Sequence, residues 1–260
     1  MTGVRLRHGA ATDVGLVREI NEDAYLAAPP AFVVADGMGG HDRGDIASRI
    51  VVAEFARAAD VGYDLDDGRE FIATTLRACR ARIATYDEEQ RAAGAHDFAA
   101  GTTAVVALLL QHAIEPSWLL ANLGDSRIYR RHRGVLQQIS VDHSVVQELI
   151  EAGAITEVDA AVHPERHIIT RALGGRGSVE ADYFVLPVAA GDRLMLCSDG
   201  VNGLIHDDEI SQILTSLSDP LDAAEQVVAA AVAAGGHDNA TAVVVDVVGL
   251  VDEQTYDSDA

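Results

Sequence analysis

Several aspartates stand where an apolar segment of the sequence meets a turn. Asp36 ends the segment 32–36 and is followed by Gly37, and Asp199 follows the apolar run 194–197. Asp125 follows the segment 119–124, and Asp238 precedes the last apolar segment. Carboxylates at the ends of neighbouring core strands converge in space, and two of them about 4 Å apart repel by roughly 4 kcal/mol at an effective dielectric of about 20. We therefore expect a cation between them.

The ligand type predicts which cation this is. Carboxylate and carbonyl oxygens without Cys or His select Mg²⁺ or Mn²⁺, with Ca²⁺ as a further option. Two such ions about 3.5 to 4 Å apart activate a water and neutralise an attacked phosphoryl group. Arg18, five residues before Asp23, would bind two phosphate oxygens as a fork. An ordinary turn explains any single Asp-Gly pair equally well, so the prediction depends on the recurrence of the pattern.

The elements that must position these residues follow from hydrophobic periodicity. We expect strands at 32–36, 102–111, 118–122, 183–188, 193–197 and 242–248, a hairpin of 127–131 with 134–139, and helices at 47–58, 72–86, 144–150 and 220–234. The segment 153–177 is irregular, polar and punctuated by Gly and Pro, which suits a mobile surface subdomain. Because helices come in pairs and strands in runs, the pattern favours two sheets packed together with helix pairs outside.

Composition excludes several function classes. The 260 residues include 19 basic ones, all Arg, against 41 acidic ones, giving a net charge of −22 that repels nucleic acid and anionic membranes. Lysine is absent, which excludes lysine-dependent kinases and Schiff-base enzymes. A cysteine-dependent phosphatase needs Arg six positions after its Cys, whereas Cys79 and Cys197 are followed there by Thr85 and Gly203. There is no secretory signal and no apolar run long enough for a span, so we expect a cytoplasmic location.

Six short motifs also occur in a distinctive order: Arg18-Glu-Ile-Asn-Glu-Asp23, Ala35-Asp-Gly-Met-Gly-Gly-His41, Gly101-Thr-Thr103, Asn122-Leu-Gly-Asp-Ser-Arg127, Ser198-Asp-Gly200 and His237-Asp-Asn239. From about Arg5 to Gly249 the chain resembles the bacterial metal-dependent Ser/Thr protein phosphatases of the protein phosphatase 2C family. The resemblance implies an α+β fold, a four-layer α-β-β-α sandwich of two antiparallel sheets flanked by helix pairs. It also implies a small flap subdomain at about 143–177 within a catalytic domain of residues 1–250, followed by an acidic disordered tail at 251–260.

The resemblance implies a role for each site residue. Two catalytic Mn²⁺ or Mg²⁺ ions are expected, with a third, weaker one. The expected assignments are Asp36 and the Gly37 carbonyl, with Asp199 and Asp238, for the two catalytic ions; Asp125 and Asp199 for the third; Glu22, Asp23 and Asn239 as supports of ligands and waters; and Arg18 as the phosphate anchor. Animal relatives carry a His directly after the Asp-Gly pair, where this chain has Met38, so the candidate general acid is His41 or a metal-bound water. The histidines of the flap and its edge, His143, His163 and His167, are expected to be exposed to solvent.

The expected reaction is hydrolysis of phosphoserine and phosphothreonine esters by metal-activated water, without a covalent phosphoenzyme. The expected partners are phosphorylated Ser/Thr proteins, including Ser/Thr kinases, with no nucleic acid and no membrane, and the expected state is a monomer. The alternative is a catalytically idle relative that binds phosphoproteins. Such a protein would have lost a metal-binding aspartate, whereas Asp36, Asp199 and Asp238 are all present.

Overall fold

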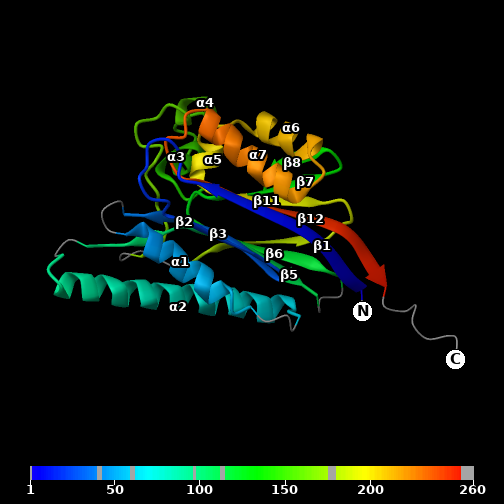
Figure 1. Cartoon of the computed structure of the whole chain (residues 1–260), viewed down its shortest axis with the longest axis horizontal. Coiled ribbons are helices and arrows are strands. Elements are labelled where there is room, and N and C mark those ends of the chain that lie inside the picture. Colours follow the sequence, from blue (N-terminus) through cyan, green and yellow to red (C-terminus); the bar gives the residue numbers. More distant parts are fainter. Residues whose placement is uncertain are drawn as a thin grey trace, which may run out of the picture.

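Two antiparallel sheets lie face to face between two layers of helices (Figure 1). The structure is a computed structural model, which describes residues 2–39, 43–58, 62–95, 98–111, 115–174 and 180–252. The expected α-β-β-α sandwich is confirmed, with α1 and α2 outside one sheet and α6 and α7 outside the other.

One sheet has five strands in the order β1-β12-β11-β7-β8. Its members are β1 (Thr2–Asp13), β7 (Arg127–His132), β8 (Val135–Gln138), β11 (Arg193–Cys197) and β12 (Ala240–Asp252). The first and last strands pair from Thr2 opposite Asp252 to Asp13 opposite Ala240.

The other sheet has seven strands, six of them in the order β10-β6-β5-β3-β4-β9, with β2 on the free side of β3. Its members are β2 (Asp23–Ala28), β3 (Ala31–Met38), β4 (Gly101–Thr102), β5 (Ala104–Leu110), β6 (Ser117–Leu123), β9 (Leu173–Gly174) and β10 (Asp182–Pro187). The two-residue strands β4 and β9 extend the sheet only at the end of β3, where Gly37 lies opposite Thr102.

The helices cover the outer faces of the sheets. The seven-stranded sheet carries α1 (Gly44–Phe55) and α2 (Leu65–Ala92), and the five-stranded sheet carries α5 (Asp199–Asn202), α6 (Asp207–Ser216) and α7 (Pro220–Ala233). Two short helices, α3 (Val145–Glu151) and α4 (Glu157–Ala160), lie in the segment between β8 and β10.

Strand alternation divides the apolar side chains among three cores. In β5, Val105 and Leu109 point between the sheets, whereas Val106 and Leu108 point toward α1 and α2. In β11, Leu194 and Leu196 point between the sheets and Cys197 points toward α5, α6 and α7. Strands with both faces buried are apolar throughout, which explains the uninterrupted run at 104–110.

The structure adds elements that the sequence pattern did not predict: β1, β2, α4, α5, α6 and β9. The predicted strand 102–111 is two strands, because Thr103 interrupts it. Strand β12 continues through Asp252, so residues 251 and 252 of the predicted tail belong to the sheet. Residues 253–260, and 175–177 of the predicted flap, lie outside the described residues. Within the described ranges, no helix combines the length and apolar composition that a membrane span requires.

Candidate active site

The pairing of β2 with β3 brings two of the predicted carboxylates together. Asp23 begins β2 and lies opposite Asp36 near the end of β3. Burial, followed by the charges of Asp23, Asp199 and Asp125, raises the pKa of Asp36 well above its ordinary value. Burial also raises the pKa of Asp23 to about 7, although Ser198 donates a hydrogen bond of 2.7 Å to its Oδ2.

Asp199 reaches the same place from the other sheet. It is the first residue of α5, directly after β11, and its charge is one of those that raise the pKa of Asp36. Its pKa is raised, first by burial and then by the charge of Asp238. The mutual repulsion of these carboxylates favours a cation bound between them.

Asp125 completes the group from the loop between β6 and β7. It is only 7 % exposed, and burial with the nearby charges of Asp199 and Asp142 raises its pKa to about 7. Within the described residues, one oxygen each of Asp23 and Asp125 is buried without a hydrogen-bond partner. Unpaired buried oxygens are costly, so these positions favour a bound cation or water.

Backbone hydrogen bonds fix Asp36 on both sides. The Asp36 N–H donates to Oγ1 of Thr103 over 3.0 Å, and the Asp36 carbonyl accepts from the Thr103 N–H over 2.9 Å and from the Thr102 hydroxyl over 2.9 Å. The Thr103 hydroxyl is also bonded to that of Ser126 over 2.7 Å. All three hydroxyl residues are buried, so this clamp links Asp36 to the residue next to Asp125.

The glycines after two of the aspartates allow the backbones to pack closely. A β-carbon at Gly37 would collide with the carbonyl oxygens of Glu22 and Gly44, and one at Gly200 would collide with that of Asn239. The sequence therefore needs glycine at both positions to bring these segments together.

At the edge of the group, Arg18 donates a hydrogen bond of 2.7 Å to Oδ2 of Asp238. This bond and the Asp238 charge raise the pKa of Arg18 against the effect of burial. The predicted phosphate anchor and a predicted metal ligand are thus in direct contact.

Asn239 holds the loop that carries Arg18. Its Oδ1 accepts from the Glu22 N–H over 2.8 Å, and its Nδ2 donates to the carbonyls of Val14 and Ile20 over 2.9 and 3.0 Å. Burial raises the pKa of Glu22, and the Gly44 N–H opposes this by donating to its carboxylate. The described side-chain bonds of Asn239 are therefore made to backbone groups.

The segment between β8 and β10 lies beside this group. Its strand β9 pairs with β4, which pairs with the end of β3. His167 of the same segment lowers the pKa of Asp199 through its charge. His143, for which we expected an exposed side chain, is only 4 % exposed. His41 lies outside the described residues.

The structure thus brings together Arg18 and five predicted carboxylates, Asp23, Asp36, Asp125, Asp199 and Asp238. The sequence predicted no role for the motif Gly101-Thr-Thr103, nor for Ser126 and Ser198, which lie inside other motifs. These hydroxyl residues could have been found from the sequence only because they lie inside the motifs shared with the phosphatase family.

The donor set fits a hard cation, because every side chain in the group except Arg18 offers oxygen. Within the described residues, however, no three His, Cys, Asp or Glu side chains already form a group that could hold an ion. Asp238 is instead paired with Arg18. Two buried unpaired oxygens remain at the site.

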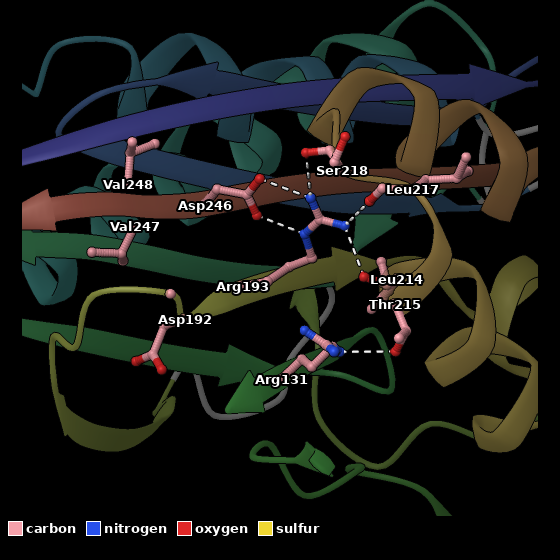
Figure 2. Close-up of a pocket in the computed structure, with 11 residues that line it drawn as sticks. Arg131, Asp192, Arg193, Leu214, Thr215, Leu217, Ser218, Asp246, Val247 and Val248 are labelled. Atoms are coloured by element: carbon pink, nitrogen blue, oxygen red, sulfur yellow. Dashed lines mark hydrogen bonds and ion pairs between the residues drawn. The ribbon is translucent and has the colours of Figure 1, made fainter. Parts of the chain in front are cut away.

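A cavity of about 300 Å³ lies elsewhere, at the start of β11 (Figure 2). Arg193 at its wall donates to both oxygens of Asp246 and to the carbonyls of Leu214, Leu217 and Ser218. Its charge is fully paired within the protein, so we assign the cavity no part in the active site.

The fold and the buried carboxylate group together are those of a metal-dependent phosphohydrolase. Residues 18–234 match the family model described as protein phosphatase 2C. The chain therefore belongs to the protein phosphatase 2C family.

Named relatives agree with this assignment. The chain is 36% identical over 243 residues to a serine/threonine phosphatase, stp, of Listeria monocytogenes, with 90% of this chain and 93% of the relative covered. It is 37% identical over 247 residues to serine/threonine protein phosphatase PstP of Mycobacterium tuberculosis, covering 94% of this chain and 45% of the longer PstP.

Solved structures agree as well. The crystal structure of M. tuberculosis PstP/Ppp has a TM-score of 0.84 at 35% identity, covering 94% of this chain and 99% of that one. The catalytic domain of PstP in complex with two manganese ions has a TM-score of 0.82 at 35% identity, covering 95% and 99%.

Proposed function

We propose that the protein hydrolyses phosphoserine and phosphothreonine esters in proteins, with water activated by two divalent ions, Mn²⁺ or Mg²⁺. The observation that carries this proposal is the cluster of carboxylates of Asp36, Asp125 and Asp199 next to strand ends, with Arg18 at its edge. Family membership, the names of the relatives and the two manganese ions of the PstP structure support it.

Each residue has a part in binding the ions. Asp36 would bridge the two catalytic ions, the Gly37 carbonyl would bind one of them, and Asp199 with Asp238 would bind the other. Asp125 and Asp199 would hold a third, weaker ion. When bound, the ions lower the pKa of water and offset the charge of the phosphoryl group. Asp23, the first residue of β2, and Glu22, directly before it, would support the metal-binding carboxylates. Asn239 would support them by holding the loop of Arg18.

Arg18 can pair either with Asp238 or with the phosphate of the substrate. The oxygen of Asp238 that accepts from Arg18 is an atom that a cation at Asp238 would need. A guanidinium released from Asp238 presents two parallel N–H groups, which match two phosphate oxygens. Arg18 would then hold the substrate in line for attack.

The remaining catalytic role is that of the general acid, which protonates the departing serine or threonine oxygen. Met38 cannot supply a proton, so His41, three residues further along, is our proposal for this role. The idle, phosphoprotein-binding alternative gains no support, because no predicted metal-binding carboxylate is missing.

Finer features of the biology are proposals of the same kind. The substrates would include Ser/Thr kinases, and the protein would act as a cytoplasmic monomer without nucleic-acid partners. The net charge of −22 supports the last point, and two free, buried cysteines suit a reducing compartment.

The first test is hydrolysis of p-nitrophenyl phosphate at neutral to mildly alkaline pH with Mn²⁺, with Mg²⁺ and with EDTA. We expect activity with Mn²⁺ that EDTA removes, followed by dephosphorylation of phosphoserine and phosphothreonine peptides. Folded protein that is inactive with every metal would overturn the proposal in favour of a binding protein. A trapped phosphoenzyme would overturn the direct attack by water.

A further inference from the structure

His143 is buried where three parts of the fold meet. Its Nδ1 accepts a hydrogen bond from the Gly124 N–H over 3.1 Å, in the loop that carries Asp125. Its Nε2 lies 3.2 Å from Oδ2 of Asp182, the first residue of β10. Arg171, near the far end of the same segment, donates to Oδ1 of Asp182 over 2.9 Å. The imidazole therefore joins the loop, β10 and the segment 143–174.

These contacts define the protonation state of the ring. A backbone N–H can only donate, so Nδ1 carries no proton and Nε2 donates its own to Asp182. Arg171 also lies 3.3 Å from Nε2, but both groups are donors in this tautomer, so the Arg171 hydrogen bond belongs to Asp182. A second proton on Nδ1 would point at the Gly124 N–H. Only the neutral imidazole fits this arrangement.

Backbone bonds bring both ends of the segment to the same place. The His143 N–H donates to the Gly124 carbonyl over 3.0 Å, and the His143 carbonyl accepts from the Thr170 N–H over 2.8 Å. Ser144 pairs with Ile169 in an isolated bridge. The entry and the exit of the segment thus converge on one residue.

The loop of Asp125, which His143 contacts through Gly124, is tightly packed and cannot easily move. Gly124 has a φ of +118°, and an added β-carbon would collide with the side chain of Thr103, a member of the clamp on Asp36. Asn122 donates to the Val141 carbonyl over 2.7 Å. Protonation or substitution of His143 should therefore displace either the loop of Asp125 or the segment 143–174.

We propose that His143 is a positioning residue whose neutral imidazole holds the segment 143–174 against the loop of Asp125, and that protonation releases the segment and weakens binding of phosphoprotein substrates. The kinetic part rests on the proposed function, whereas the structural part does not. The segment is placed to act on substrate, because β9 pairs with β4 beside Gly37 and His167 interacts with Asp199.

The charges that face His143 set the pH range of this release. Burial lowers its pKa, the Asp182 hydrogen bond raises it, and the charge of Arg171 lowers it, while the charges of Asp182 and Asp142 raise it. The net result lies below the ordinary value of 6.5, so release belongs to the acid side of that value.

The test uses two substitutions that do not titrate. His143→Asn keeps an acceptor near the position of Nδ1 and loses the donor to Asp182, whereas His143→Gln keeps a donor near the position of Nε2 and loses the acceptor for Gly124. His163→Asn is the matched control, because His163 lies in the same segment and its Nδ1 bonds only locally, to the Glu165 N–H over 3.2 Å. Asp182→Asn removes a half-exposed carboxylate next to the ring and serves if the His143 variants do not fold.

The readout is hydrogen exchange of residues 144–173 and 122–126 between about pH 5 and about pH 8, corrected for intrinsic exchange and needing no catalysis. In the wild type, protection of both regions should fall roughly tenfold on acidification, the cost of a lost hydrogen bond. His143→Asn should abolish this pH dependence, His143→Gln should lower protection of 122–126 already at the alkaline end, and Asp182→Asn should move the transition to lower pH. His163→Asn should behave as the wild type.

Kinetics give the second readout. The KM for a phosphoserine peptide should rise on the acid side in the wild type but not in His143→Asn, while the KM for p-nitrophenyl phosphate should change less. Equal pH dependence of exchange in the wild type and His143→Asn would overturn the proposal, even if hydrolysis occurs. The predicted exchange pattern without any hydrolysis would instead overturn the proposed function and leave the positioning role standing.

Discussion

The guanidinium of Arg18 lies 2.7 Å from Oδ2 of Asp238, 220 residues further along the chain. Their side chains are 47% and 37% exposed, so the pair contributes little to stability, about 0 to 1 kcal/mol. A weak pair between a proposed phosphate anchor and a proposed cation ligand is easily exchanged. We therefore expect Arg18 and Asp238 to exchange this contact for their proposed ligands, a phosphate and a cation.

Replacing Arg18 should mainly weaken phosphate binding. Arg18→Ala removes a charged fork worth about 1.5 to 3 kcal/mol, so the KM for p-nitrophenyl phosphate and the inhibition constant of inorganic phosphate should rise roughly 10- to 100-fold. Arg18→Lys should recover only part of this, because an ammonium lacks the two parallel donors. Steady-state kinetics with phosphate as inhibitor measure the effect. Arg77→Ala, on the exposed face of α2, is the control, and an unchanged KM in Arg18→Ala would remove Arg18 from this role.

Replacing Thr103 should disturb the position of Asp36, although Asp36 itself is unchanged. Thr103→Val keeps the shape but leaves the buried Asp36 N–H and the Ser126 hydroxyl without their shared partner, at a cost of about 1 to 3 kcal/mol. We expect a lower free energy of unfolding in urea and weaker Mn²⁺ binding by calorimetry. Thr103→Ser, which keeps the hydroxyl, should restore both. Thr85→Val on α2 controls for loss of a hydroxyl, and Mn²⁺ affinity equal to that of the wild type in Thr103→Val would contradict the clamp.

The metal-free protein should become less stable as the pH rises. Burial raises the pKa of Asp23 and Asp125 to about 7 from an ordinary 3.8, so the folded state binds protons that the unfolded state has released. The stability they contribute is full below about 4 and is lost as the pH approaches 7, with a slope of up to about 1.4 kcal/mol per pH unit for each group. Urea unfolding in EDTA across this range measures it.

Mn²⁺ should reverse this loss, because an ion that binds only the folded state stabilises it by about 2.7 kcal/mol at a hundredfold excess over Kd. Asp36→Asn is the informative variant. It should raise the metal-free stability at about pH 8, since a buried charge is removed, and it should abolish the response to Mn²⁺. A metal-free stability that rises with pH over the same range would show that these carboxylates are not held as described.

Thiol reagents should leave the native protein active. Cys79 and Cys197 are buried, and burial raises the pKa of each thiol to about 12, so neither forms the reactive thiolate near neutral pH. Iodoacetamide should therefore modify neither cysteine in the native state, as read by mass spectrometry, while both should react in urea. Inactivation that parallels modification of Cys197 would place a thiol in the mechanism.

Elements with strong periodicity could be predicted from the sequence, because burial of one or both faces leaves a pattern. The strands β5 and β11 and the helices α2 and α7 are of this kind. β1 was missed because it is an edge strand: Arg5 and Arg7 interrupt its apolar pattern, and its one partner among the described strands, β12, lies more than 200 residues away. The helix α6 was missed because it is short and only Ile210, Ile213 and Leu214 form its buried face, too few positions to show a helical period.

The carboxylates of the site could be predicted because acidic side chains at strand ends are unusual in an apolar context. The residues that hold them could not. Thr103 and Ser126 act on a backbone group and on each other, so their roles depend on partners that the sequence does not place. His143 was expected at the surface, and it is buried because the loop of Gly124 and the strand β10 cover it.

The pairing of β1 with β12 also sets the order in which the enzyme can be completed during synthesis. The first strand pairs with residues 240–252, and Asp238 and Asn239 immediately precede that strand. While the ribosome is still translating the residues before 238, β1 has no partner strand, Arg18 has no Asp238, and the loop of Arg18 lacks the Asn239 amide. Contacts between residues so far apart in the sequence form slowly, because the entropy of loop closure must be overcome first. We therefore expect a nascent chain to acquire the Arg18–Asp238 contact, and with it the proposed site, only after residues 238–252 have been translated.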